Sequence, residues 1–294
     1  KPKEETPDTS MPKGKRSSES GDTNQSPTKK KANAYRMIPF GDWKPEYTFM
    51  GDMKVLGAMW FGKIAGDSHQ DRLESFYKSQ AQLYDGYRSR MLHARVPLMS
   101  RLPVEADRKG SVVWVDLGGG TGSNVEYVAP AIEQGWFKRI VVLDLTPSLC
   151  EVAKERVQKR WPGGPVEVLC ADACEEGAEG LPPAGSCDLV TFSYALVMIP
   201  EWKKAVDHAL RLLRPNGHLG VCDFTVLPEQ GQSGVMQSFW KKTFASDHVI
   251  LSTEHREYLK AVTKEVYEET GFGGLPYVPP FLKAGWYAYI GKKE

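Results

Sequence analysis

The stretch Asp116-Leu117-Gly118-Gly119-Gly120-Thr121-Gly122 decides the fold, because it lies where a strand pattern gives way to a helical one. Residues 112–116 (Val-Val-Trp-Val-Asp) favour a strand, and residues 123–132 favour a helix. A chain that turns this sharply needs glycine, and so does a backbone that a ligand must approach closely, since any Cβ would collide. The stretch therefore predicts a ligand-binding turn at the edge of an α/β domain.

On both sides of this turn, apolar strands alternate with helical patterns, which is typical of an α/β domain with a parallel sheet. Strands are predicted over residues 112–116, 140–144, 166–169, 188–192 and 218–224. Helices are predicted over residues 123–132, 147–160 and 201–213, the last ending at the turn 214–217, and then over 234–244 and 254–260. Residues 262–269 and 286–290 alternate like a closing strand pair. We predict a seven-stranded, mostly parallel sheet with a C-terminal antiparallel strand pair and helices on both faces.

The glycine spacing excludes two other nucleotide-binding motifs. In the dinucleotide fingerprint the third glycine would stand where Ser123 is, and no Gly-Lys-Ser/Thr follows as a P-loop requires. Asp116, beside the loop, would repel a pyrophosphate, whereas it suits the cationic ammonium group of S-adenosylmethionine (SAM) or a water network around it. Gly118, Gly120 and Gly122 supply the close backbone approach. The loop predicts SAM as the cofactor.

Further cofactor-binding residues are predicted at the ends of the next strands, where ligands gather in open α/β sheets. They are Asp144, Leu145, Asp172, Ala173, Ser193 and Tyr194. Asp144 can accept both ribose hydroxyls, and Asp172 can accept from the adenine amino group while Ala173 offers its backbone N–H. Ser193 and Tyr194 would face the sulfonium. The alternative is that Asp144 and Asp172 only cap the helices that follow.

Methyl transfer is an in-line displacement that needs alignment and exclusion of water more than an acid or a base. An amine acceptor must be neutral at attack, and aromatic faces stabilise its cationic product by roughly 0.5 to 2 kcal/mol each. The aromatic side chains available for this are Tyr77, Tyr84, Tyr87, Tyr194, Trp240 and Phe244. Packing in the core is the alternative role for each of them.

The overall composition indicates a globular protein whose net charge produces no strong electrostatic field. Its 38 basic and 37 acidic side chains leave a net charge of +1, which gives nothing to attract nucleic acid or an anionic membrane globally. The cysteines are odd in number and lie in apolar stretches, as reduced core thiols do: Cys150, Cys170, Cys174, Cys187 and Cys222. Neither a disulfide framework nor a metal site is expected. We find no apolar run long enough to span a membrane and no apolar signal core.

Two segments precede the predicted domain, which we place at residues 71–294. Residues 1–36 are polar and rich in lysine, so a disordered tail is expected there. Residues 37–70 contain many aromatic side chains, Trp43, Tyr47 and Phe49 among them. This segment is expected either to pack on the domain as a cap or to contact a membrane surface.

Segments that flank the glycine loop are more specific than the loop itself. The residues that carry a family resemblance are 73–77 (Leu-Glu-Ser-Phe-Tyr), Gln80, Tyr84, Asp85, Arg88, 90–93, Arg95, 222–226 (Cys-Asp-Phe-Thr-Val), 239–244 (Phe-Trp-Lys-Lys-Thr-Phe), Asp247, Leu251, Ser252, Glu254, His255, 276–279 and 287–291. Over about residues 70 to 292 the chain resembles the methyltransferase half of betaine lipid synthase, a Rossmann-like class I SAM-dependent methyltransferase.

The resemblance implies successive methylation of diacylglyceryl-homoserine to the betaine lipid diacylglyceryl-trimethylhomoserine. It implies that Tyr77, Tyr84 and Arg88 close over the methionyl end of SAM and the headgroup. We predict Tyr84 and Tyr194 as the catalytic residues. Arg88 can pair with a carboxylate, or alternatively with Asp85 on its own helix. The family also implies an aminocarboxypropyl transferase, fused or separate. We expect a cytoplasmic protein that is peripheral on the endoplasmic reticulum membrane. Because the chain starts at Lys1 without this partner domain, we expect an excised module or a stand-alone methyltransferase.

The residues after the fourth predicted strand bear on which methyl acceptor the protein uses. Nucleic-acid amino-methylating enzymes carry a polar Asn/Asp/Ser-Pro-Pro-aromatic motif there, whereas residues 193–195 are Ser-Tyr-Ala, so no nucleic acid partner is expected. Residues 278–281 (Val-Pro-Pro-Phe) lack the polar first residue. A methyltransferase acting on a quinone ring or another small amine stays an alternative, because a fold does not fix its substrate. A non-catalytic SAM-binding scaffold is the alternative from another class.

Overall fold

The computed structural model describes residues 35–61, 66–78, 80–245 and 249–294, without the side chains of residues 59–61 and Tyr84. The tail predicted for residues 1–36 lies outside these ranges except for Tyr35 and Arg36. Both of these residues belong to the short strand β1 (Tyr35–Met37).

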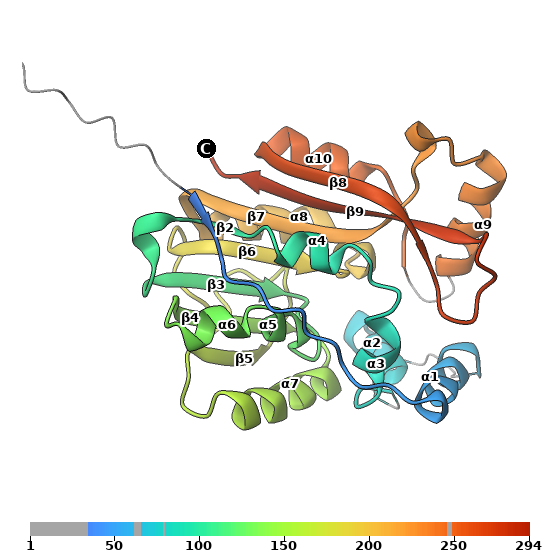
Figure 1. Cartoon of the computed structure of the whole chain (residues 1–294), viewed down its shortest axis with the longest axis horizontal. Helices are drawn as coiled ribbons and strands as arrows, with labels where there is room; N and C mark the ends of the chain where they lie inside the picture. The colour runs from blue at the N-terminus through green and yellow to red at the C-terminus, as the bar shows by residue number, and fades with distance from the viewer. Residues whose placement is uncertain (1–34, 62–65, 79, 246–248) are drawn as a thin grey trace, which may run out of the picture. The chain divides into compact units, whose positions relative to one another are not determined.

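A seven-stranded sheet forms the centre of the domain, with the strand order β5-β4-β3-β6-β7-β9-β8. Its strands are β3 (Val112–Leu117), β4 (Phe137–Asp144), β5 (Val166–Cys170), β6 (Cys187–Ser193), β7 (Leu213–Thr225), β8 (Lys264–Gly274) and β9 (Lys283–Lys292). The first five are parallel, while β9 runs antiparallel to both β7 and β8. The predicted sheet is therefore confirmed, including its closing antiparallel pair (Figure 1).

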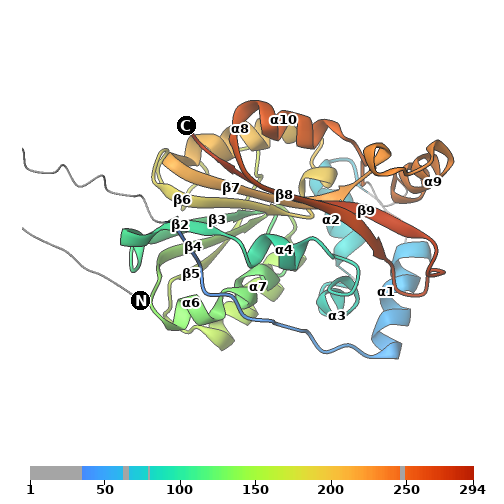
Figure 2. The ribbon, with the colours of Figure 1, turned by 45° about the horizontal axis from the view of Figure 1, so that its top comes forward.

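Helices cover both faces of the sheet, because the central strands are apolar on both sides. Trp114, Ile140 and Val142 face one core, beneath α4 (Arg95–Met99), α5 (Ser123–Tyr127) and α6 (Ala129–Glu133). Their neighbours Val115 and Val141 face a second core, beneath α8 (Trp202–Leu212) and α10 (Glu254–Val262). The long helix α7 (Pro147–Arg160) lies beside β4 and β5. Figure 2 shows α8 and α10 on the opposite side of the sheet from α4, α6 and α7.

Two predicted elements differ in the structure. The helix predicted over residues 123–132 is divided into α5 and α6 at Val128, whose φ is −106°. Val128 directly precedes α6, which has Pro130 in its first turn. Proline fits the first turn of a new helix but not the interior of a continuous one. The turn predicted at residues 214–217 is a bulge inside β7, where the partner of β6 shifts from Leu213 to His218.

The segment before the sheet packs on it. β1 (Tyr35–Met37) pairs with β2 (Pro103–Glu105), and the Phe40 ring stacks on Tyr127 at 5.8 Å. The following α1 (Phe49–Phe61) contacts α3 (Tyr84–Arg88), and α2 (His69–Tyr77) contacts α7. Tyr77 ends α2 and Arg88 ends α3, so these two predicted site residues lie on separate short helices.

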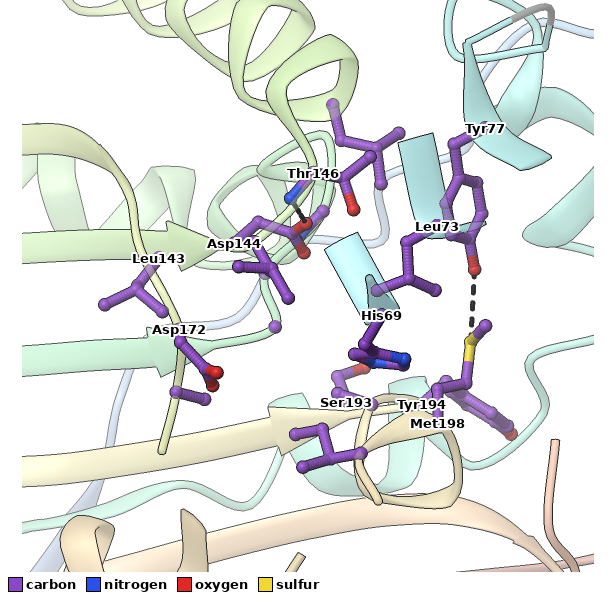
Figure 3. A pocket seen from close by; sticks show the side chains of 18 of the residues that line it. His69, Leu73, Tyr77, Leu143, Asp144, Thr146, Asp172, Ser193, Tyr194 and Met198 are labelled. Carbon is purple, nitrogen blue, oxygen red and sulfur yellow. Dashed lines mark hydrogen bonds between the residues drawn. The ribbon is translucent and has the colours of Figure 1, made fainter. Parts of the chain in front are cut away.

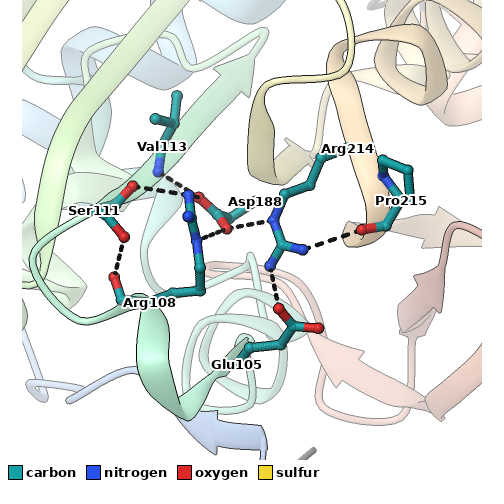
Figure 4. Close-up of polar contacts among 7 residues, drawn as sticks. All are labelled: Glu105, Arg108, Ser111, Val113, Asp188, Arg214 and Pro215. Carbon is teal, nitrogen blue, oxygen red and sulfur yellow. Dashed lines mark hydrogen bonds and ion pairs between the residues drawn. The ribbon is translucent and has the colours of Figure 1, made fainter.

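A cluster of ion pairs joins the amino ends of the strands (Figure 4). The buried carboxylate of Asp188 accepts from Arg108 Nε at 2.8 Å and Nη2 at 3.0 Å, and from Arg214 Nε at 2.7 Å. It also accepts from the Val113 N–H at 2.9 Å. These contacts hold β6 to β3, to the start of β7 and to the loop that enters the sheet.

Four of the five cysteines are buried as free thiols, but Cys170 is exposed at the end of β5, which corrects the expectation that all five lie in the core. Among the described residues no helix has both the length and the apolar character needed to cross a bilayer. Within the same residues no three His, Cys, Asp or Glu side chains gather as a metal would require.

Candidate active site

A cavity of about 320 Å³ opens at the carboxyl ends of β3, β4, β5 and β6. Its lining comes from the glycine loop, from the loops after the next three strands, and from α2 and α4. Figure 3 shows Asp144 and Asp172 at the strand ends and Leu73 and Tyr77 of α2 to the right of them. This is the edge where open α/β sheets bind their ligands.

The glycine loop turns as the sequence predicts. Gly118, Gly120 and Gly122 have φ values of 69°, 58° and 70°, in the left-handed region that favours glycine. A Cβ on Gly118 would lie 2.5 Å from the Cβ of Ala195, so this position also needs glycine for space. A Cβ on Gly120 would meet no atom within 4 Å, because this residue faces the cavity. Gly118 and Gly120 line the cavity, and Gly122 turns the chain into α5.

Asp144 ends β4 with its carboxylate in the cavity and only 8% of its surface exposed. The carboxylate accepts from the N–H of Gly120 and from that of Thr146, both at 2.9 Å. Burial raises the pKa of Asp144, and the two backbone donors act against that rise. Thr146 is the N-cap residue of α7, so this bond fixes the turn before the helix and does not satisfy an N–H of its first turn, while the contact with Gly120 ties the acid to the loop. Leu145 also lines the cavity, and its carbonyl accepts from Gln70 of α2 at 3.0 Å.

Asp172 and Ala173 line the cavity beyond β5. Asp172 accepts from the Cys174 N–H at 2.8 Å, in a turn that no helix follows, so helix capping does not explain this acid. The Ala173 carbonyl accepts from His208 at 2.8 Å, which fixes the turn against α8. The predicted residues Asp144, Leu145, Asp172, Ala173, Ser193 and Tyr194 therefore lie around one cavity.

Asp116 does not line the cavity, which corrects its predicted contact with the ammonium group of SAM. Its fully buried carboxylate accepts from Thr191 Oγ1 at 2.6 Å and from Asn124 Nδ2 at 2.8 Å. Burial raises its pKa to about 6, although both of these hydrogen bonds act in the opposite direction. Asp116 thus positions β3 against β6 and α5 rather than a ligand.

Arg95 is a candidate binding residue that motif analysis did not single out. Its side chain lines the cavity and is 5% exposed. It donates to Ser193 Oγ at 3.3 Å and to Ser123 Oγ at 3.1 Å, and no carboxylate in the described part of the chain lies within 4.0 Å of it. Both serine partners are neutral, and the charge of Asp116 acts on the guanidinium without a direct ion pair, so Arg95 is still suited to an anionic ligand group.

Tyr77 and Tyr194 enclose the cavity with Met198. The Tyr77 hydroxyl donates to the Met198 sulfur at 3.1 Å, which connects α2 to the 3-10 turn Leu196–Met198 (Figure 3). Tyr194 has a left-handed φ of 56°, and its hydroxyl accepts from the Ala94 N–H at 2.9 Å. Non-glycine residues keep such a conformation where the surroundings fix it, often at functional sites.

Of the other predicted aromatic and basic residues, those with described side chains lie outside the cavity lining. Tyr87, Trp240 and Phe244 pack in a buried cluster, in agreement with the packing alternative. Arg88 is buried on α3 and is absent from the cavity lining among the described residues. The side chain of Tyr84 lies outside those that the structure describes.

The comparisons with known proteins agree with this geometry. Residues 115–221 match a family model described as a methyltransferase domain. The fold is that of the Rossmann-like class I methyltransferases, and the chain carries a SAM-dependent methyltransferase domain.

The individual proteins that match the chain have low sequence identity to it. The chain is 27% identical over 168 residues to the ubiquinone/menaquinone biosynthesis C-methyltransferase UbiE of Salmonella arizonae, covering 56% of this chain. The alignment spans 64% of that relative, less than two thirds of its length. A solved structure of phosphoethanolamine N-methyltransferase 2 from Haemonchus contortus aligns at a TM-score of 0.56 with 16% identity, over 78% of this chain and 60% of that one. A geranyl diphosphate methyltransferase aligns at 0.52 with 12% identity, over 74% and 83%.

Proposed function

We propose that the protein is a SAM-dependent N-methyltransferase that converts diacylglyceryl-homoserine to diacylglyceryl-trimethylhomoserine by successive methylations. The observation that carries the methyl-transfer part is that the charged groups suited to SAM line one cavity: Asp144, Asp172 and Arg95. SAM, when bound, supplies a methyl group on a sulfonium. The residues of the chain bind the cofactor, orient it and exclude water.

Each of these groups has a chemical counterpart in the cofactor. Asp144 accepts the two ribose hydroxyls, a role in which a buried carboxylate beside a glycine loop serves nucleosides well. Asp172 accepts from the adenine amino group, next to the backbone of Ala173. Arg95 pairs directly with the methionyl carboxylate, since no described carboxylate lies within 4.0 Å of its guanidinium.

The acceptor side is inferred from Tyr77, Tyr194 and Met198. Two aromatic rings and a thioether provide faces that stabilise a cationic ammonium product without adding a charge of their own. The assignment of a homoserine lipid rests on the resemblance of residues 70–292 to the betaine lipid family. A solved structure of the same fold is an amine N-methyltransferase, which supports the reaction class.

A second candidate function is methylation of a quinone ring. It is favoured by the Salmonella relative, whose printed activity is C-methylation in ubiquinone and menaquinone biosynthesis. Carbon methylation leaves a proton on the ring that a base must remove, and His69 lines the cavity as a candidate base.

The decisive experiment is incubation of the protein with methyl-labelled SAM and either diacylglyceryl-homoserine or a demethylated quinol, followed by mass analysis of the lipid products. We expect mass increases of one, two and three methyl groups on the homoserine lipid, and none with the Asp144→Ala variant. Methylation of the quinol alone would replace the proposal with the second candidate. SAM binding without turnover on either acceptor would favour the scaffold alternative.

A further inference from the structure

Three segments far apart in the sequence expose large apolar side chains. They are α1, α9 (Gly234–Ala245) and the loop of residues 275–282 between β8 and β9. We call the following six residues the apolar rim: Phe49, Met50, Val235, Phe239, Tyr277 and Phe281. Their exposed fractions range from 43% to 82%, where soluble surfaces usually place polar side chains.

The apolar rim is one surface rather than scattered residues. The rings of Phe49 and Tyr277 lie 6.2 Å apart, and the Tyr277 hydroxyl donates to Asp52 of α1 at 2.5 Å. Beneath the rim, a shared hydrophobic cluster includes Val55 of α1, Trp240 of α9 and, packed against it, Val278 of the loop. Figures 1 and 2 both show α1, α9 and the β8–β9 loop at the same end of the domain.

This end is also the end that holds the cavity. Tyr194 and Met198, which line the cavity, pack against the cluster that supports the apolar rim. A surface that the rim contacts would therefore lie beside the cavity, at the carboxyl ends of the parallel strands.

The charge around the apolar rim is positive. Lys54, Lys241, Lys242 and Lys283 are exposed, and none of them forms an ion pair with a described carboxylate. The only acid in α1, α9 or residues 275–283 is Asp52, which is 1% exposed and pairs with Arg90 at 2.6 Å. Four local positive charges thus stand out from a chain with a net charge of only +1.

We propose that the apolar rim and its four lysines dock the protein on an anionic bilayer surface. Aromatic and aliphatic side chains enter the boundary between headgroups and acyl chains, while lysines nearby pair with lipid phosphates. A second copy of the chain is disfavoured as the occupant, because two copies would bring like-charged lysines together. The inference rests on the proposed function for its purpose, which is to let a lipid headgroup enter the cavity.

The test is co-sedimentation of the full chain with vesicles of phosphatidylcholine alone or with phosphatidylserine added. The apolar variant is Phe49→Ser/Met50→Ser/Phe281→Ser, and the charge variant is Lys241→Gln/Lys242→Gln/Lys283→Gln. The matched control is Met37→Ser/Val266→Ser, which removes side chains of 54% and 49% exposure on β1 and β8. SAM binding by calorimetry shows that each variant is folded.

We expect the wild type and the control to partition onto anionic vesicles at least tenfold better than the apolar variant, and the charge variant to lose the preference for anionic over neutral vesicles. Equal sedimentation of the wild type and the apolar variant would overturn the proposal. So would a dimer that the apolar variant abolishes in the absence of vesicle binding. Failure of methyl transfer with intact vesicle binding would refute the proposed acceptor and leave the docking surface standing.

Discussion

Thr121 in the glycine loop donates a hydrogen bond of 2.8 Å from its Oγ1 to Asp85 Oδ1 on α3. Asp85 also forms an ion pair with Arg156 on α7. One carboxylate therefore connects the loop that approaches the cofactor, the helix α3 before the sheet and the helix that follows β4. The position of α3 and the shape of the glycine loop should depend on each other.

The first prediction concerns this contact. Thr121→Val keeps the shape of the side chain but removes the donor, so Asp85 loses a partner while keeping Arg156. Because a hydrogen bond to a charged group contributes about 1.5 to 3 kcal/mol, we expect roughly tenfold or greater weakening of SAM binding in calorimetry. Thr121→Ser, which retains the hydroxyl, is the control and should bind like the wild type. Unchanged affinity in Thr121→Val would show that the loop holds its shape without α3.

The second prediction assigns a partner to Arg95. Arg95→Met replaces a buried guanidinium with an apolar chain of similar length, so it should weaken SAM binding by one to two orders of magnitude, or about 1.5 to 3 kcal/mol. Decarboxylated SAM, which lacks the carboxylate, should bind the variant about as well as it binds the wild type. Calorimetry of the wild type and Arg95→Met with both compounds forms a double-mutant cycle, which isolates the contribution of the contact between Arg95 and the SAM carboxylate.

A matched arginine substitution outside the cavity controls for a general loss of structure. Arg101→Met removes an exposed arginine that follows the same helix, and it should leave the affinity for both compounds unchanged. Equal losses for SAM and decarboxylated SAM in Arg95→Met would mean that Arg95 supports the cavity wall and does not bind the carboxylate.

The sheet and most of the cavity could be predicted from the sequence, because both follow from local patterns. Gly118, Gly120 and Asp144 lie at strand ends that apolar periodicity marks clearly. Arg95 could not be found this way. It begins a five-residue helix without a periodic pattern, and its partners Ser193 and Ser123 are 98 and 28 residues away in the sequence.

The direction of the Asp116 side chain follows from the alternation of side chains along β3. Side chains alternate along a strand, and Val112 and Trp114 face the core beneath α4, α5 and α6. Asp116 follows in the same register, so it points into that layer and not toward a ligand. What the sequence does not reveal is that Thr191 and Asn124 supply the donors that a buried carboxylate needs.

The third prediction uses the pKa of Asp116. Because its pKa in the folded protein is about 6 against an ordinary 3.8, the folded state binds the proton more tightly than the unfolded state. The stability that this provides is fully present below pH 3.8 and is lost as the pH rises through 6. A shift of this size corresponds to about 3 kcal/mol at most.

Asp116→Asn should remove this dependence, since an amide does not titrate and a flip of the Asn124 amide can restore the hydrogen bonds. Urea unfolding at several pH values between 4 and 7 measures the effect. We expect the stability of the wild type relative to the variant to fall as the pH rises across this range. A constant difference would show that Asp116 is charged throughout it.

The fourth prediction concerns Asp188, a buried acid with the opposite behaviour. Burial alone would raise its pKa, but hydrogen bonds from Arg108, Val113 N–H and Arg214 outweigh burial and lower it. Its contribution to stability is therefore present above the ordinary pKa of 3.8 and lost as the pH falls below that value. Asp188→Ala leaves two arginines without this partner and should cost about 3 to 5 kcal/mol at neutral pH.

The control is Glu167→Ala, which breaks the Arg139 ion pair at a carboxylate that is 50% exposed and should cost less than about 1 kcal/mol. Asp188 lies at the amino end of β6 and Ser193 at its carboxyl end, so the affinity of folded Asp188→Ala for SAM should equal that of the wild type. Thermal unfolding and calorimetry together separate the two ends of the sheet. If Asp188→Ala weakens SAM binding while Glu167→Ala does not, the ion-pair cluster also sets the geometry of the cavity, five residues away along the same strand.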